Sequence, residues 1–95
     1  MNETDKCLLY NSALNEYGIK AQQMVLIEEC GELLDVIAKS YRNRTGISDI
    51  ITELADVSIM VEQMAFFYGL DDYRAEKERK LLRLKERLSN HLDKK

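Results

Sequence analysis

The fold is decided by the stretch at residues 25–36, which reads VLIEECGELLDV. At 3.6 residues per turn, one wide apolar face is formed by Leu26, Ile27, Cys30, Leu33, Leu34, Ile37 and Tyr41. The opposite, polar side carries Glu28, Glu32, Asp35 and Lys39. Glu29 and Glu32 share a row with two valines, where a carboxylate that loses its water needs a compensating cation. We therefore expect this helix to bring paired carboxylates to a metal ion.

The composition is typical of a small helical domain that associates with itself. The chain has 95 residues, of which 45% are hydrophobic and 33% charged, with no Pro, no Trp and four Gly. Such a composition favours long helices with brief connections. A chain this short buries only a modest fraction of its surface. We expect one domain, residues 1–95, and self-association, because four short helices cannot easily hide so many apolar side chains.

Charge and hydropathy give no support to several classes of function. The net charge of −3 is the opposite of the basic excess that nucleic-acid-binding proteins usually show. No run of residues is apolar enough to span a bilayer, and the acidic N-terminus lacks a signal-peptide pattern. Cys7 and Cys30 both fit helical apolar positions, and two cysteines without a framework indicate a reducing compartment. We therefore expect a cytoplasmic protein with neither nucleic acid nor membrane as a partner.

Helical periodicity and turn residues predict four helices, at residues 4–17, 20–42, 48–68 and 71–90. The residues expected to bound them are Thr4 or Asp5 and Ser48 as N-caps, and Gly18 and Gly69 as C-terminal stops. Residues 43–46 form the clearest turn, and residues 91–95 are expected to be frayed.

The last two predicted helices differ in character. The helix at 48–68 is apolar almost all round, which is typical of a buried helix. In the helix at 71–90, Leu81, Leu84 and Leu88 form a seam like that of a coiled coil. Between positions 74 and 87 that helix carries seven basic residues against three acidic ones. It is a locally basic segment of an acidic protein.

Two helices each offer a pair of acids three residues apart, Glu29 with Glu32 and Glu53 with Asp56. Residues at this spacing project from one side of a helix, and a short turn lets the two helices pack antiparallel with the pairs facing. Carboxylate and water ligands suit Mg²⁺ or Mn²⁺, whereas a single histidine, His91, argues against a di-iron site. The alternative, that these acids lie on ordinary solvated helix faces, stays open at this point.

The chain resembles the MazG-like, all-α nucleoside triphosphate pyrophosphohydrolases, in the short form found in phages and bacteria. The resemblance is carried by EECGE at residues 28–32 and ELAD at residues 53–56, which are similar to the family signature EExxE…ExxD. It extends from the first helix to the basic fourth one. The resemblance implies a four-helix fold that assembles into a helical-bundle dimer or tetramer, with the exposed side of the third helix as subunit contact.

The resemblance also implies an activity. Such enzymes cleave a ribo- or deoxyribonucleoside triphosphate between the α and β phosphates, giving the monophosphate and pyrophosphate, and some remove unwanted nucleotides. Carried over by position, the Mg²⁺ ligands are Glu29, Glu32, Glu53 and Asp56, and Glu28 is a catalytic carboxylate that orients water. A bound cation neutralises phosphate charge and lowers the pKa of an attacking water.

A polyphosphate also needs fixed positive charge, and the predicted phosphate-binding residues are Lys77, Lys80 and Arg83. The base-binding pocket is not evident, because aromatic residues at helical spacing are more often part of a core. Within the same superfamily, a dUTPase-like or phosphoribosyl-ATP-type activity is a close rival. Outside it, the rival is a non-catalytic helical interaction module that retains the fold.

Overall fold

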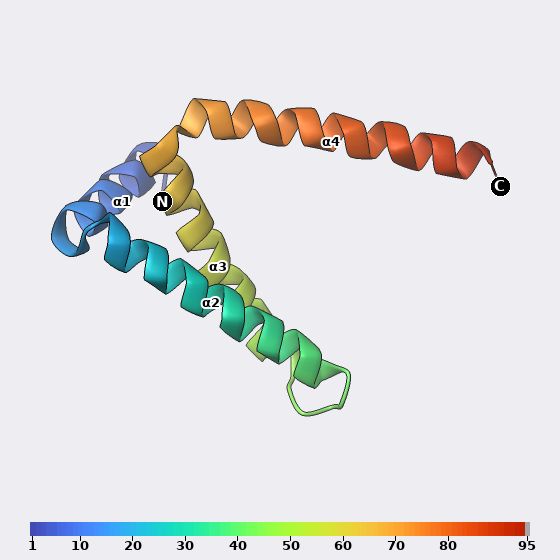
Figure 1. Cartoon of the computed structure of the whole chain (residues 1–95), viewed down its shortest axis with the longest axis horizontal. Helices are drawn as coiled ribbons and strands as arrows, with labels where there is room; N and C mark the ends of the chain where they lie inside the picture. The colour runs from blue at the N-terminus through green and yellow to red at the C-terminus, as the bar shows by residue number, and fades with distance from the viewer. Residues whose placement is uncertain (95) are drawn as a thin grey trace.

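A computed structural model describes residues 1–94, and all of its regular structure over that range is helical. The helices are α1 (Glu3–Tyr17), α2 (Ile19–Ser40), α3 (Ile47–Tyr68) and α4 (Leu70–Asp93) (Figure 1). The prediction of an all-α chain with four helices is confirmed. Among the described residues, no helix combines the length and the apolar character needed to cross a membrane.

Both predicted N-caps were wrong. Asn2 caps α1, because its Oδ1 accepts the backbone N–H of Asp5 at 2.8 Å, so neither Thr4 nor Asp5 does so. Gly46 occupies the cap position of α3, and the Asp49 carboxylate accepts the Gly46 N–H at 3.3 Å. Ser48 thus lies inside the helix.

The helix ends also differ from the prediction. α2 ends at Ser40 rather than at position 42, because the chain turns at residues 41–43 and enters the left-handed region at Asn43, with φ 55°. α4 continues to Asp93, so the expectation of a frayed end was wrong for residues 91–93. Lys95 lies outside the described residues.

The hairpin, α2 with α3, is the main packing unit of the chain. The two helices run antiparallel and make most of the contacts between elements (Figure 1). In their seam, the side-chain amide of Gln63 donates to Oε1 of Gln22 at 2.6 Å, with both side chains buried. Met60 and Met64 of α3 are buried beside them. The antiparallel packing that the short turn predicts is present.

The core of a single chain is small. Its buried apolar residues are Tyr10, Met60, Met64 and Ala65, and among the described residues no side chain is completely buried. The third helix is therefore not buried all round as predicted. The apolar composition of α3 predicts that its surface is covered on all sides, and α1 and α2 cover only part of it.

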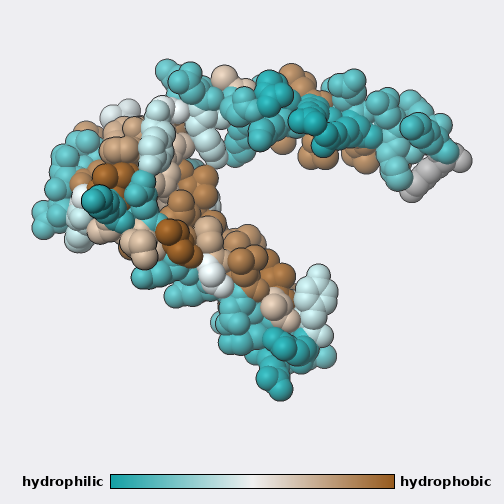
Figure 2. Space-filling view, viewed as in Figure 1, coloured by the Kyte–Doolittle hydropathy of each residue, from teal (hydrophilic) through white to brown (hydrophobic). Residues whose placement is uncertain are grey.

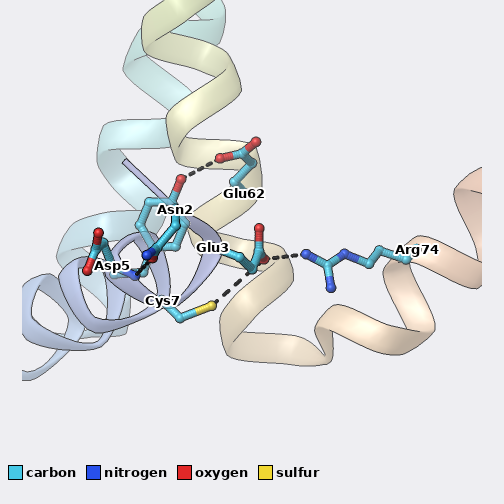
Figure 3. Close-up of polar contacts among 7 residues, drawn as sticks. Asn2, Glu3, Asp5, Cys7, Glu62 and Arg74 are labelled. Atoms are coloured by element: carbon cyan, nitrogen blue, oxygen red, sulfur yellow. Dashed lines mark hydrogen bonds and ion pairs between the residues drawn. The ribbon is translucent and has the colours of Figure 1, made fainter.

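α1 packs against both α2 and α3, at the end of the hairpin away from the turn at residues 41–46 (Figure 1). Tyr10 of α1 is buried and its hydroxyl donates to the Glu62 carboxylate (Figure 3). Burial, together with that hydrogen bond, raises the pKa of Tyr10 to about 12. The hydroxyl therefore stays protonated and keeps its role as a donor at any ordinary pH.

α4 leaves the hairpin at a sharp angle and runs away from it (Figure 1). The change of direction takes place at Gly69, whose φ of 144° is unfavourable for residues with a side chain. Within the described residues, the helix packs only against α3, and Arg74 adds an ion pair with Glu3 of α1 (Figure 3). Most of α4 is exposed to solvent.

Candidate metal centre

Three of the four predicted metal ligands converge in the seam of the hairpin. Glu29 of α2 and Glu53 and Asp56 of α3 each offer one carboxylate oxygen, and these oxygens lie within 4.8 Å of one another. The i, i+3 spacing puts the two α3 acids on one side of their helix. Antiparallel packing brings Glu29 opposite them. We refer to these three residues as the carboxylate cluster.

The carboxylate cluster is partly withdrawn from water. All three side chains are half-buried, and Oε2 of Glu29 and Oε2 of Glu53 are each buried without a hydrogen-bond partner. A buried charged oxygen with no partner costs free energy. A cation between the helices would remove that cost, and a donor set made only of carboxylate oxygens fits a hard ion such as Mg²⁺ or Mn²⁺.

Burial and mutual repulsion shift the titration of the cluster. Burial and the negative charge of Glu32 raise the pKa of Glu29 from its ordinary 4.5 to about 7. Burial also raises the pKa of Glu53, and the negative charges of Glu32 and Asp56 add to that effect. Close carboxylates cannot all ionise without compensation. The metal-free cluster therefore retains protons that solvated acids would lose.

The other two motif acids lie at the edge of this arrangement. Glu32 is exposed and is not among the three converging residues, although its charge raises the pKa values of both glutamates in the cluster. Glu28 is also exposed, about 100° around α2 from its neighbour Glu29. A role for Glu32 as ligand and for Glu28 in catalysis stays a prediction.

The predicted phosphate-binding residues lie apart from the carboxylate cluster in a single chain. Lys77 places its amine 5.7 Å from the centre of the Tyr73 ring. Lys80 lines the same groove of α4 as Lys77, and Arg83 is exposed further along. Because α4 runs away from the middle of α3 (Figure 1), one chain does not bring these cations and the acids together.

The buried amide pair, Gln22 with Gln63, was not predicted from the sequence. Gln22 precedes Glu29 by seven residues and Gln63 follows Asp56 by seven, so the pair lies about two helical turns from the cluster in the same seam. Separating the two buried amides would leave each without a partner at a cost in free energy, so the hydrogen bond favours the alignment of α2 and α3 that keeps them together. We infer that this pair positions the carboxylates. The sequence indicates this pair only through its spacing, which is seven residues from Gln22 to Glu29 and seven from Asp56 to Gln63.

The raised pKa values predict how stability depends on pH and metal. Between about pH 4.5 and pH 7, the folded metal-free chain holds the Glu29 proton more tightly than the unfolded chain does, given its pKa of about 7. The melting temperature in EDTA should therefore fall as pH rises through this window. Added Mg²⁺ should raise it, and more at pH 8 than at pH 5.5, because the ion binds the ionised cluster.

The matched control is Glu29→Gln, measured by thermal unfolding under the same conditions. This variant lacks the Glu29 carboxyl group. Its melting temperature should therefore depend less on pH than that of the wild type, and should respond much less to Mg²⁺. An identical slope in both proteins, or melting curves that millimolar Mg²⁺ leaves unchanged, would contradict the assignment of this centre.

Comparison of the chain with protein-family models, with curated proteins and with solved structures gives no match in any of the three.

Proposed function

We propose that the chain is a Mg²⁺-dependent nucleoside triphosphate pyrophosphohydrolase of the MazG-like type, which cleaves its substrate between the α and β phosphates. The observation that supports the proposal most is the carboxylate cluster, where Glu29, Glu53 and Asp56 meet from two helices. The proposal includes a homodimer or homotetramer, Mn²⁺ as a substitute ion, and a cytoplasmic location. The proposed cytoplasmic location agrees with Cys7 and Cys30 being free thiols.

Each side chain of the candidate site has its own role in the proposed reaction. The carboxylate cluster holds the ion, and Glu32 at its edge adds negative charge or a further ligand. Glu28 orients an attacking water. When bound, Mg²⁺ supplies charge neutralisation on the polyphosphate and a more acidic water. Lys77, Lys80 and Arg83 bind phosphate oxygens and fix their position, which is the main requirement of phosphoryl chemistry.

A substrate panel tests the proposal directly. The purified chain is incubated with Mg²⁺ and each common ribo- and deoxyribonucleoside triphosphate, and pyrophosphate and orthophosphate are measured separately. Release of pyrophosphate without orthophosphate is the expected result, since it reports α–β cleavage. The Glu53→Gln variant, purified in parallel, controls for contaminating enzymes. If no nucleotide yields pyrophosphate, the proposal is wrong.

The second candidate is a non-catalytic helical interaction module. It is favoured by the long exposed apolar surface of α4, where Leu81, Leu84 and Leu88 are each at least half exposed. In this case no nucleotide is hydrolysed, and Glu53→Gln titrates with metal in the same way as the wild type.

A further inference from the structure

A cavity of about 170 Å³ lies where α1, α3 and α4 meet. Within residues 1–94, both α1 and α4 pack against α3, but they do not pack against each other. Arg74 of α4 reaches across to form an ion pair with Glu3 of α1 (Figure 3). Both of these residues are part of the cavity lining. The cavity is therefore a space that the fold leaves between α1 and α4, beside the ion pair that joins them.

One part of the cavity lining is aromatic and apolar. Tyr10 of α1 and Phe66 of α3 place their ring centres 6.4 Å apart, with an angle of 50° between the rings. Leu70 and Tyr73 of α4 complete this part of the lining. An apolar cavity of about 150 Å³ holds one benzene molecule, and aromatic rings favour a further ring beside them. The cavity thus has the size and the lining for one six-membered aromatic ring.

The cavity is separate from the candidate metal centre. Glu62, which lines it, lies about 120° around α3 from Asp56 and about 9 Å further along the helix. Pockets that enclose a larger ligand measure roughly 300–1,000 Å³, so this cavity is too small for a nucleoside triphosphate. The hydrophobic surface between the hairpin and α4 in Figure 2 belongs to a different groove, which is lined by Leu26, Val61 and Met64.

The rest of the cavity lining is charged, and it is better suited to an anion than to a cation. It consists of Glu3, Lys6, Glu62, Arg74 and Lys77. Both acids already have a partner, since Glu3 pairs with Arg74 and Glu62 accepts the Tyr10 hydroxyl. Within residues 1–94, neither lysine makes an ion pair. Lys77 instead holds its amine 5.7 Å from the centre of the Tyr73 ring. The donors available to a ligand beside the aromatic wall are therefore two amines.

We propose that this cavity binds a small aromatic anion, a single six-membered ring that carries a carboxylate or a phosphate. The ring lies against Tyr10 and Phe66, and the anionic group accepts hydrogen bonds from Lys6 of α1 and Lys77 of α4. Because these amines come from different helices, the bound anion adds a second link between α1 and α4 and holds α4 in its direction. The inference does not depend on the proposed activity.

An NMR titration of the full, isotope-labelled chain tests the proposal, in EDTA and without nucleotide. The probes are benzoate and phenyl phosphate, and their relative affinity shows whether the anionic group is a carboxylate or a phosphate. We expect a dissociation constant of about 1 mM or below, which small ligands reach readily, with backbone amide shifts centred on the cavity lining. Benzyl alcohol, acetate, inorganic phosphate and benzylamine, which lack the ring or the negative charge, should bind at least about 10-fold more weakly.

Two substitutions with matched controls locate the contacts. Lys6→Gln should weaken binding of both probes by about 10- to 100-fold, because it removes a hydrogen bond between charged groups. Lys20→Gln, at an exposed lysine of α2 outside the lining, should leave it unchanged. Phe66→Leu should weaken binding by about 2- to 10-fold through the loss of an aromatic contact, whereas Phe67→Leu, at the exposed neighbour, should not.

Three results would overturn the proposal. These are no saturable shift with either probe, benzylamine binding as tightly as benzoate, or equal affinity in Lys6→Gln and Lys20→Gln. If Phe66→Leu does not fold, Cys7→Met decides, because Cys7 is half-buried in the cavity lining and a longer side chain there fills the space. This variant should keep its helical circular dichroism and lose both probes, and unchanged binding would refute the site.

Discussion

Replacing Glu53 by Gln is expected to lower Mg²⁺-dependent pyrophosphate release by at least about 100-fold, since even residues that only orient metal ligands contribute 10- to 100-fold. The amide keeps the size of the side chain but offers no charge to a hard cation. Glu53 also supplies one of the two buried carboxylate oxygens that have no hydrogen-bond partner, so the variant removes a ligand that a bound cation would use. Turnover of the best nucleotide at saturating Mg²⁺ is the measurement.

The same variant should become more stable without metal. In EDTA the wild-type chain keeps three carboxylates within 4.8 Å, and removing one of them relieves repulsion. The melting temperature of Glu53→Gln in EDTA should therefore lie above that of the wild type, while its response to Mg²⁺ is lost. Activity and stability that change in opposite directions cannot result from misfolding.

Asp35→Asn provides the matched control. Asp35 lies on α2 and makes an exposed ion pair with Lys39, a type of contact that contributes little. Its loss removes the same charge without touching the cluster, and activity and metal response should be unchanged. A Glu53→Gln protein that hydrolyses nucleotides as well as Asp35→Asn does would refute the proposed function.

Replacing Gln22 by Leu should destabilise the chain by about 1–3 kcal/mol, because it leaves a buried amide without its partner. Gln63 is only 3% exposed and donates to Gln22 at 2.6 Å. Its NH₂ group would have to stay buried without an acceptor or pull the seam open. Urea unfolding at fixed protein concentration, followed by circular dichroism, measures the loss.

The double variant, Gln22→Leu with Gln63→Leu, should recover much of that stability, because replacing both partners by apolar groups removes the unsatisfied amide. If the seam also aligns the carboxylates, the double variant will still bind Mg²⁺ more weakly than the wild type. Equal stability of the single and double variants would show that the hydrogen bond contributes nothing to the hairpin.

Helix number and the pairing of α2 with α3 were predictable because local signals are strong. Gly18, the turn after Ser40 and Gly69 interrupt the apolar periodicity at three places, and a short turn leaves antiparallel packing as the simple solution. The caps were harder, because Asn2, Thr4 and Asp5 are all suitable N-cap residues within one helical turn. Only the backbone geometry selects among them.

The positions of the candidate-site residues were predictable where helical spacing alone determines them. The i, i+3 spacing predicted two facing pairs, Glu53 with Asp56 and Glu29 with Glu32. Glu53, Asp56 and Glu29 converge, whereas Glu32 lies outside the three converging residues. The pair Gln22 with Gln63 was missed because amides in a charged sequence resemble ordinary surface. The position of Lys77 relative to the acids depends on the backbone turn at Gly69, whose angle no periodicity reveals. The periodicity of apolar residues identifies the apolar face of each helix, but it does not identify the surface that packs on that face.

The short connection at residues 41–46 has a consequence for the order of folding. Contacts between α2 and α3 close a small loop, and small loops close within microseconds or less, so the hairpin should form early and at a rate independent of protein concentration. Assembly of the proposed homodimer or homotetramer depends on two chains meeting, so it would follow. Refolding should then show a fast unimolecular phase and a slower phase whose rate rises with concentration.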